Sequence, residues 1–247
     1  MKILSCNTGY FLGFEKPLPN YLLDPKRSCL GNSKKEEESM DALAELINRE
    51  DPDIVALQEV DQGSIRTRTG GQASALEEKL EKSYSVEIRE KYGPEKLLSH
   101  LPVMNKMSNA ILSSGGEIRE HFLEPGSKQL LLEYRSEEKD LSIFSTHMPT
   151  LYRYRKKQLR KVKEKLLERE RAVLCGDFNC YRGKKELEEI FSETGYRVRS
   201  PGPTHPRSDP YRELNLFIVP EEMDIRVRKI QADISDHLPV LAEIPGI

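Results

Sequence analysis

The segment AVLCGDFN, residues 172–179, joins a run of apolar residues to a polar turn. The apolar half is typical of a buried strand, which delivers its last residues to the edge of a sheet. In the turn, Asp177 and Asn179 stand two positions apart. The carboxylate can orient an attacking water, and the amide can donate to a phosphate oxygen without adding charge. Taken alone, the segment also fits an Asx turn with purely structural hydrogen bonds.

Polar residues also end four other segments of the chain, as Asp177 and Asn179 end the first. These segments are Asn7 after Ile3-Leu4, Gln58-Glu59 after Ile54-Val55-Ala56-Leu57, Thr146-His147 after Leu141-Ser142-Ile143-Phe144, and Ser235-Asp236-His237. Strand ends from distant parts of a sequence can meet at one sheet edge. Carboxylates, amides and imidazoles that meet in this way can form a divalent-cation site that faces a phosphate. The sequence therefore predicts one reaction centre.

Glu59 is the carboxylate expected to bind the metal, because it follows a buried strand and needs a partner there. With Asp236 and Asn7 close by, such a sparse oxygen site suits Mg²⁺, or Mn²⁺, better than zinc. A strand-end glutamate paired with an arginine is the alternative interpretation. His147 and His237 can donate to a developing oxyanion or exchange a proton with water or the leaving oxygen. The other histidines are single residues in loop-like context and are expected to be non-catalytic: His100, His121 and His205.

The composition is that of a folded, soluble protein. The chain has 247 residues, of which 37% are hydrophobic and 32% are charged, and its formal net charge is −2. This length, without linkers, repeats or low-complexity segments, predicts one domain over residues 1–247. The near-neutral charge argues against a generic nucleic-acid coat protein but does not exclude a nuclease.

Two further features bear on where the protein works. No segment approaches the roughly 18 consecutive apolar residues that a membrane span requires, and no signal peptide is recognised at the start. The four cysteines, at positions 6, 29, 175 and 180, form no CxxC pair. They are expected to be reduced structural thiols, so the expected location is the cytoplasm.

The pattern of apolar residues predicts many strands and few helices. Helices are expected around residues 40–47, 73–81, 150–169 and 184–191. Strands are expected over residues 3–7, 54–57, 83–89, 109–112, 129–134, 141–146, 171–175, 214–219, 225–229 and 240–244. Residues 8–33, 61–71 and 91–107 are expected to be loops. This balance favours two sheets packed on each other, with helices outside.

The five polar segments, in this order, resemble the endonuclease/exonuclease/phosphatase superfamily, as do residues 109–113 and the pair Arg155 and Gln158. Its members include deoxyribonuclease-I-like and exonuclease-III-like nucleases, sphingomyelinases and inositol-polyphosphate phosphatases. Each motif is weak alone, but the resemblance runs from residue 3 to residue 244. It implies an α/β (α+β) fold, namely a four-layer α/β/β/α sandwich of two packed mixed sheets flanked by helices. It also implies an Mg²⁺-dependent phosphoesterase activity.

The resemblance implies a role for each strand-end residue. Glu59 would be the metal ligand, assisted by Asn7 and Asp236. Asp177 would position or activate the water, and Asn179 would contact the phosphate. The two histidines would complete the catalytic set, since His237 would be the acid/base residue and His147 would stabilise the transition state.

One position departs from the family pattern. The family usually carries an aspartate on a late strand, which orients the acid/base histidine, and the matching residue here is Asn215. Asn215 can accept a hydrogen bond from His237 but cannot stabilise an imidazolium by charge. Three explanations stay open: weak activity, a His237 that works in its neutral form, or a substitute carboxylate. The candidate substitutes are Asp209, Asp233 and Glu213.

The substrate is indicated only by basic and aromatic residues. Tyr152 and Arg155 lie in the basic helix predicted over residues 150–169, and Arg66 and Arg68 follow the metal-site strand. All four are candidates for contacting a nucleic-acid backbone. A solvated helix face balanced by glutamates is the alternative for the basic helix.

Three functions therefore stay open. The leading one is a nuclease that cuts phosphodiester bonds in DNA or RNA by metal-assisted, in-line attack of water. The second is a phosphatase or phosphodiesterase that acts on a small or lipid-derived phosphoester. The third is a catalytically weakened binding module that retains the fold, for which Asn215 is the main argument. None of the three requires stable membrane insertion, and the oligomeric state stays open.

Overall fold

Two six-stranded sheets form the centre of the computed structural model, which describes residues 1–13, 33–65, 67, 70–92, 103–136 and 138–247. The strand order is β11-β12-β1-β2-β4-β3 in the first sheet and β5-β6-β7-β8-β10-β9 in the second. Each sheet is mixed. β1 with β2 and β7 with β8 are parallel pairs, and the other neighbours are antiparallel.

The elements have the following bounds. The first sheet contains β1 (Lys2–Asn7), β2 (Ile54–Asp61), β3 (Ser85–Glu90), β4 (Met107–Ser113), β11 (Arg226–Lys229) and β12 (Val240–Glu243). The second contains β5 (Glu117–Phe122), β6 (Leu130–Ser136), β7 (Leu141–His147), β8 (Ala172–Asp177), β9 (Tyr196–Arg199) and β10 (Asn215–Pro220). The helices are η1 (Gly9–Phe11), α3 (Ser33–Glu50), α4 (Gln72–Glu77), η3 (Met104–Lys106), α5 (Tyr152–Leu167) and α6 (Lys185–Phe191).

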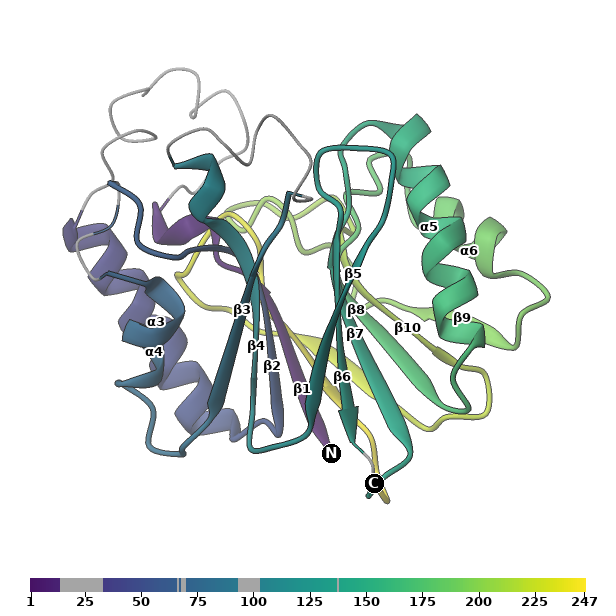
Figure 1. The fold of residues 1–247 in the computed structure, drawn as a ribbon, viewed down its shortest axis with the longest axis horizontal. Coiled ribbons are helices and arrows are strands. Elements are labelled where there is room, and N and C mark those ends of the chain that lie inside the picture. The colour runs from purple at the N-terminus through teal and green to yellow at the C-terminus, as the bar shows by residue number, and fades with distance from the viewer. Residues whose placement is uncertain (14–32, 66, 68–69, 93–102, 137) are drawn as a thin grey trace.

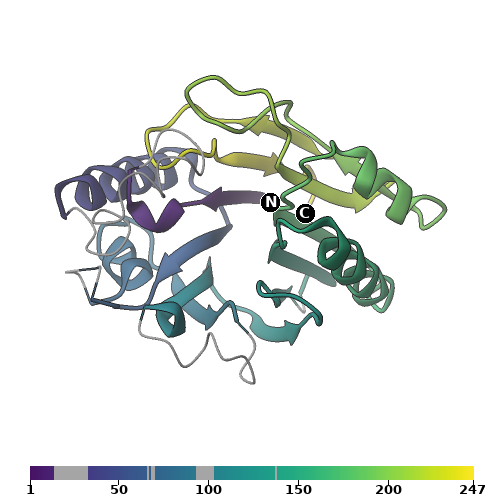
Figure 2. The same ribbon diagram turned by 90° about the horizontal axis from the view of Figure 1, so that it is seen from above.

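The elements stack in four layers, which confirms the predicted sandwich. Figure 1 shows α3 and α4 outside the first sheet and α5 and α6 outside the second, and the view from above in Figure 2 shows the same order. Apolar side chains fill all three interfaces. Leu43 and Ile47 of α3 pack on the first sheet, Ile3 and Val173 meet between the sheets, and Leu159 of α5 packs on the second. Strands buried on both faces explain the continuous apolar runs in the sequence.

Two strands were not predicted, β5 and β9. Both lie at the edges of the second sheet, where one side of a strand has no neighbour. Their side chains are mostly half-buried or exposed, so their sequences lack the apolar run of a central strand. The predicted loop over residues 61–71 also begins late, because β2 continues to Asp61.

Strand register explains why distant polar motifs meet. Asn7 at the end of β1 lies opposite Gln58 of β2, and His147 at the end of β7 lies opposite Asp177 at the end of β8. β10 runs antiparallel to β8, so its first residue, Asn215, also lies opposite Asp177. All these positions gather at the end of the sandwich away from the two chain termini (Figure 1).

Three of the cysteines are buried and form no disulfide: Cys6, Cys175 and Cys180. Burial raises the pKa of the Cys6 and Cys175 thiols to about 12, which makes both unreactive at neutral pH. These three fit the expected structural thiols, and Cys29 lies outside the described residues. None of the helices that the structure describes has both the length and the apolar character needed to cross a bilayer.

Glu133 of β6 anchors the outer face of the second sheet. Its fully buried carboxylate accepts hydrogen bonds from Arg169 (2.6 and 2.9 Å) and Ser142 (2.9 Å), and lies 2.9 Å from a ring nitrogen of His121. Burial raises the pKa of Glu133, but these partners outweigh burial and hold it well below its usual range.

We expect Glu133→Gln to lower the free energy of unfolding by about 1–3 kcal/mol at pH 7, because it removes a charged partner of Arg169. Since the folded pKa lies below the unfolded value of about 4.3, the stabilisation is present above that pH. It is lost as the pH falls from there through the folded pKa. Urea unfolding of both proteins at pH 7 and pH 3 measures the difference, and an equal deficit at both values would contradict the ionised pairing.

Candidate active site

The strand ends enclose a pocket of about 330 Å³. Its lining is largely polar and comes from both sheets and from the loops that follow them. The lining residues are Asn7, Tyr10, Glu59, Lys128, His147, Thr150, Asp177, Asn179, Tyr181, His205, Asp236 and His237. The structure thus brings together every catalytic and metal-binding candidate that the sequence analysis named, with Asn215 directly behind His237.

Glu59 reaches the pocket through an irregularity in β2. The pairing of β2 with β4 shifts register between Leu57 and Val60, and Glu59 has a backbone φ of 58°. A non-glycine residue in this region is strained, and such strain concentrates at functional sites. The side chain of Asn109 accepts a hydrogen bond from the backbone nitrogen of Glu59 (3.3 Å), and the Thr8 hydroxyl donates to its carbonyl oxygen (2.5 Å). The bulge therefore aims the Glu59 side chain at the pocket.

The Glu59 carboxylate lies among positive and imidazole groups without a close bond to any of them. Its Oε1 is 3.7 Å from Nζ of both Lys91 and Lys128 and 3.8 Å from Nδ1 of His147. In the part of the chain that the structure describes, no donor lies within hydrogen-bond distance of this carboxylate. The alternative interpretation, a pairing of Glu59 with an arginine, is not found there, and the carboxylate keeps its lone pairs available for a cation. The sequence analysis had not singled out Lys91 or Lys128.

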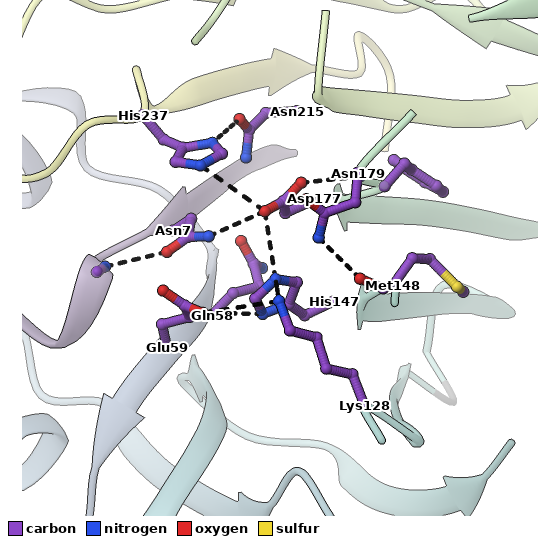
Figure 3. Close-up of polar contacts among 12 residues, drawn as sticks. Asn7, Gln58, Glu59, Lys128, His147, Met148, Asp177, Asn179, Asn215 and His237 are labelled. Carbon is purple, nitrogen blue, oxygen red and sulfur yellow. Dashed lines mark hydrogen bonds and ion pairs between the residues drawn. The ribbon is translucent and has the colours of Figure 1, made fainter. Parts of the chain in front are cut away.

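Asp177 is the centre of the polar network in Figure 3. Its Oδ2 accepts a hydrogen bond from Nδ2 of Asn7 (3.0 Å) and lies 3.3 Å from Nε2 of His147 and 3.8 Å from Nε2 of His237. The backbone nitrogen of Asn179 donates to the other oxygen, Oδ1 (2.9 Å). The side chain is thus held in one orientation by groups from β1, β7 and the turn after β8.

The two asparagines of the pocket are each partly engaged. The Asn7 Oδ1 accepts from the backbone nitrogen of Gly9 (3.0 Å) but retains a second lone pair. The Asn179 Nδ2 donates to the carbonyl oxygen of Met148 (2.8 Å) and has a second N–H for another acceptor. Asn179 also has a positive φ of 50°, which turns its side chain back toward the pocket.

Gly176, one residue before Asp177, is required by close backbone packing. Its φ is 139°, and a Cβ at this position would stand 1.9 Å from the carbonyl oxygen of Thr146 in the paired strand β7. We expect Gly176→Ala to lower the free energy of unfolding by roughly 3 kcal/mol and to abolish activity by displacing Asp177. Gly183→Ala is the matched control, because Gly183 has a φ of 94° but no atom within 4 Å of the place that the added methyl group would take. Thermal unfolding should give Gly176→Ala a clearly lower Tm than Gly183→Ala. Equal Tm values would contradict the inference that Gly176 is required by close packing against Thr146.

His147 is a neutral imidazole at physiological pH. Burial lowers the pKa of His147 well below its usual value, and the charges of Lys128 and Lys91 and of His237 lower it further. Its Nε2 contacts both Nζ of Lys128 and Oδ2 of Asp177 (3.3 Å). His147 can therefore act as a hydrogen-bonding group toward a bound phosphate rather than as a fixed positive charge.

His237 contacts the residue that replaces the expected aspartate. Its Nδ1 lies 2.8 Å from Oδ1 of Asn215, which also accepts from the hydroxyl of Thr204 (3.1 Å). Because Oδ1 is an acceptor, Nδ1 carries the proton and Nε2 faces the pocket and Asp177. The three candidate substitutes for the aspartate do not take this place. Asp233 pairs with Arg207, Glu213 binds Ser200 and lies 3.8 Å from Lys184, and no described contact links Asp209 to His237.

Asp236 lies beside His205, a histidine that the sequence analysis set aside. The Nε2 of His205 is 3.3 Å from Oδ2 of Asp236, and the rings of His205 and His237 stack with centroids 4.5 Å apart. Burial raises the pKa of Asp236, but the hydrogen bond with His205 and the nearby His237 outweigh burial and hold it below its usual value. No local pattern marks His205, whose backbone forms an isolated antiparallel bridge with Arg212.

Of the four substrate-binding candidates, the two that the structure describes, Arg155 and Tyr152, do not line the pocket. Arg155 is buried, pairs with both carboxylate oxygens of Glu186 (2.7–2.9 Å) and bonds two backbone carbonyls, so it holds α5 to α6 and is closed to substrate. Tyr152 stacks under Arg182 at 4.0 Å, away from the lining. Arg66 and Arg68 lie outside the described residues.

A different set of residues forms the rim of the pocket. Tyr181 lines the pocket and is 39% exposed, and Tyr211 beside it is 60% exposed. The guanidinium of Arg212 lies 5.0 Å from the ring centre of Tyr181 and 4.6 Å from that of Tyr211. Burial raises the pKa of Tyr181 to about 12, so its phenol stays neutral. We call Tyr181, Tyr211 and Arg212 the aromatic rim.

Comparisons with known proteins agree with the geometry. The sequence matches the model of the Endonuclease/Exonuclease/phosphatase family over residues 4–237. No curated protein matches significantly. Among solved structures, an endonuclease/exonuclease/phosphatase family protein from Leptotrichia buccalis superimposes with a TM-score of 0.70 at 19% identity, covering 99% of both chains.

Two other similar structures carry more specific names. A mannosyl-6-phosphatase from Bacteroides thetaiotaomicron has a TM-score of 0.68 at 15% identity, covering 99% of both chains. A truncated TDP2 from Caenorhabditis elegans has a TM-score of 0.59 at 16% identity, covering 98% of this chain and 95% of that one. At these identities the likeness establishes the shared fold.

Proposed function

The chain belongs to the Endonuclease/Exonuclease/phosphatase family, whose members are phosphoesterases that generally use a divalent metal, and on this basis we propose that it is a metal-dependent nuclease. It would hydrolyse phosphodiester bonds of DNA or RNA by in-line attack of water. The single observation that carries the hydrolase proposal is the convergence of Asn7, Glu59, His147, Asp177 and His237 on one pocket.

The residues present fit a divalent cation. The Glu59 carboxylate has lone pairs that no close hydrogen bond from the described residues occupies, and Asn7 retains a lone pair on Oδ1. We therefore assign Glu59 as the principal metal ligand, with Asn7 and Asp236 as candidates to assist, and Mg²⁺ or Mn²⁺ as the ion. When bound, such an ion offsets negative charge on the phosphate.

The chain's own groups divide the remaining tasks. Asp177 orients the attacking water, because its carboxylate is fixed by Asn7 and by the backbone of Asn179. The second N–H of Asn179 and the ammonium of Lys128 bind phosphate oxygens. Neutral His147 supplies a hydrogen bond to the same oxygens. The Asp177 carboxylate takes the proton released by the attacking water, and His237, with Nε2 facing the pocket, gives a proton from its imidazolium form to the leaving oxygen.

The aromatic rim favours a substrate that carries a base or another flat ring. Exposed tyrosines beside an arginine are the groups on which nucleobases stack, and such stacking does not depend on sequence. Tyr211 is far more exposed than a tyrosine with a purely structural role requires. Tyr181 of the rim lines the pocket together with Lys128 and Asn179, so a nucleotide next to the cleaved bond would reach the rim.

A small phosphoester is the second candidate function. Lys91 and Lys128 both lie 3.7 Å from Glu59, and Lys128 lines the pocket. Two ammonium groups near the Glu59 carboxylate suit a terminal phosphate with two negative charges. The third candidate, a weakened binding module, is supported by Asn215 in contact with His237. Metal-dependent turnover of any substrate would exclude the third candidate.

The test is an activity panel with Mg²⁺ or Mn²⁺ against EDTA. The substrates are plasmid DNA, abasic duplex, single-stranded DNA, RNA, bis-p-nitrophenyl phosphate, sugar phosphates and sphingomyelin. Glu59→Gln, purified in parallel, exposes any contaminating nuclease. If the nuclease proposal holds, cleavage of DNA or RNA weakens steeply between low and physiological salt, because phosphate contacts displace counterions. Salt-insensitive hydrolysis of a small phosphoester alone would favour the second candidate.

We expect Tyr211→Ala to raise KM for a DNA or RNA substrate about tenfold with little change in kcat, because stacking contributes about 1–3 kcal/mol per base. Hydrolysis of bis-p-nitrophenyl phosphate should change less. Tyr152→Ala is the matched control, since Tyr152 is also a tyrosine stacked on an arginine but does not line the pocket. Equal effects of the two substitutions on KM would argue against a substrate role for the rim.

We also propose that the protein works in a reducing compartment such as the cytoplasm. Cys6, Cys175 and Cys180 are buried, free thiols and support this location, because cysteines stay reduced in such a compartment whereas disulfides form in oxidising ones. Localisation of a tagged protein in its host by cell fractionation tests the proposal.

A further inference from the structure

A second group of metal-ligating side chains lies on the His237 side of the pocket. The candidate ligand atoms of His205, Asp236 and His237 all lie within 4.8 Å of one another, and all three residues line the pocket while being more than nine-tenths buried. Within the described residues no other trio of histidine, cysteine or carboxylate side chains meets this criterion, and Glu59 is not a member. Asp236, a candidate to assist Glu59, therefore also lies beside two imidazoles.

The spacing within this group fits a small dication. The Nε2 of His205 lies 3.3 Å from Oδ2 of Asp236. Two ligands of a tetrahedral Zn²⁺ at bond lengths of about 2.0–2.1 Å stand about 3.3–3.4 Å apart. Little movement of these two side chains is then needed to accommodate the ion.

The orientation of His237 is also fixed in the form that a metal requires. Its Nδ1 is bonded to Oδ1 of Asn215, which leaves Nε2 unprotonated in the neutral ring and facing the pocket. A metal-ligating histidine commonly has its other nitrogen held by such a partner, because that contact sets the tautomer. Thr204 in turn holds Asn215 (3.1 Å), so the orientation is supported from behind.

The chemical types of the three ligands determine which metal ion the site prefers. Two imidazoles and one carboxylate suit a borderline-soft transition metal such as Zn²⁺, whereas Mg²⁺ prefers oxygen ligands and keeps much of its water. Three protein ligands leave a fourth position open to water or to a phosphate oxygen. The Glu59 side of the pocket, with oxygen donors and two nearby lysines, does not offer this donor set.

We propose that His205, Asp236 and His237 form a second metal site that binds Zn²⁺ in preference to Mg²⁺. Occupation of this site ties up Nε2 of His237, so it withdraws the group that exchanges a proton with the leaving oxygen. Zn²⁺ at this site therefore inhibits the Mg²⁺-dependent reaction. The inhibition rests on the proposed function, whereas the binding does not.

Binding is tested on the full chain after removal of metals with EDTA. Co²⁺ replaces Zn²⁺ as a spectroscopic probe, because four-coordinate Co²⁺ gives much stronger visible absorption bands than the six-coordinate ion in water. We expect these bands in the wild type. Adding Zn²⁺ should displace the Co²⁺ and abolish the bands, whereas millimolar Mg²⁺ should leave them unchanged. Absence of the bands, or displacement by Mg²⁺ as readily as by Zn²⁺, overturns the proposal.

His205→Phe is the decisive variant, because it keeps a flat ring against His237 but removes a ligand. We expect its affinity for Zn²⁺ in calorimetric titration to fall at least tenfold. His121→Phe is the matched control, since His121 also faces a buried carboxylate, at 2.9 Å, but on β5 outside the pocket. Its affinity should equal that of the wild type. Equal loss in both variants, or no loss in His205→Phe, overturns the proposal. If circular dichroism shows His205→Phe to be unfolded, Asp236→Asn replaces it with the same expectation.

Inhibition by Zn²⁺ is measured with a substrate that the activity panel identifies, at a fixed, saturating concentration of Mg²⁺. Zn²⁺ should inhibit the wild type at a concentration at least tenfold lower than is needed to inhibit His205→Phe. Equal inhibition of the two proteins overturns the inhibitory role. If no substrate is turned over but the Co²⁺ bands depend on His205, the metal site stands and the proposed function falls.

Discussion

Replacing Glu59 with Gln is expected to lower kcat about a thousandfold at saturating Mg²⁺. The substitution keeps the size of the side chain but removes the negative charge that would hold the ion. Removing one group that stabilises the transition state by charge lowers kcat by about 10²–10³-fold or more. Folding should be nearly unaffected, because the carboxylate makes only ion pairs of 3.7–3.8 Å. Steady-state kinetics with a Mg²⁺ titration and thermal unfolding measure the two quantities separately.

Glu87→Gln is the control for this change. Glu87 is a carboxylate of the same sheet, on the edge strand β3, paired at 2.9 Å with Arg89 and remote from the pocket lining. It should retain wild-type kcat. A Glu59→Gln protein that keeps full activity and an unchanged Mg²⁺ requirement would refute the metal-binding role and leave the carboxylate as a partner of Lys91 and Lys128.

Replacing Asn215 with Asp is expected to raise kcat about a hundredfold. A carboxylate at this position would keep the contact with Nδ1 of His237, now 2.8 Å, and would add a charge that stabilises the imidazolium form, which gives its proton to the leaving oxygen. In a hydrolase with a catalytic Asp–His pair, replacing the Asp by Asn lowers kcat about ten-thousandfold. A hundredfold gain for the opposite change is therefore a modest expectation. The pH–rate profile should extend to higher pH, because His237 retains its proton more readily.

Two controls accompany Asn215→Asp. Asn48→Asp adds the same charge on α3, where Asn48 contacts Glu81 and Lys79, and should leave kcat unchanged. Asn215→Leu removes the acceptor of His237 without adding charge and should lower kcat about tenfold. No gain in a folded Asn215→Asp protein, together with no loss in Asn215→Leu, would show that Asn215 does not act through His237.

The predicted sandwich was confirmed because its strands carry a local signal. Central strands such as β7 and β8 are buried on both faces, so every position before their last residue is apolar or small, and that run is visible without any knowledge of the fold. The edge strands β5 and β9 lack such a run because half of their surface faces solvent. Sequence therefore predicted every strand of the first sheet and the four central strands of the second, but not the two edge strands of the second sheet.

The site was predictable where function depends on a strand end. Asn7, His147 and Asp177 follow apolar runs. Strand pairing places His147 opposite Asp177, and packing of the two sheets brings Asn7 to Asp177. Arg155 shows the limit of this approach. Its position in a basic helix indicated a surface cation, but the packing of α5 on α6 turned it inward onto Glu186. Local charge does not reveal which face of a helix a neighbour covers.

The sequence by itself determined where the central strands lie along the chain, which polar residues end them and which family their motifs indicate, because each depends on residues and their sequence along the chain. Only the tertiary structure decided that Lys91 and Lys128 approach Glu59, that His205 joins Asp236 and His237, and that Arg212 stacks between two tyrosines. These contacts join loops through packing and backbone bridges. Their geometry depends on where two sheets end in space, and no spacing in the sequence records that.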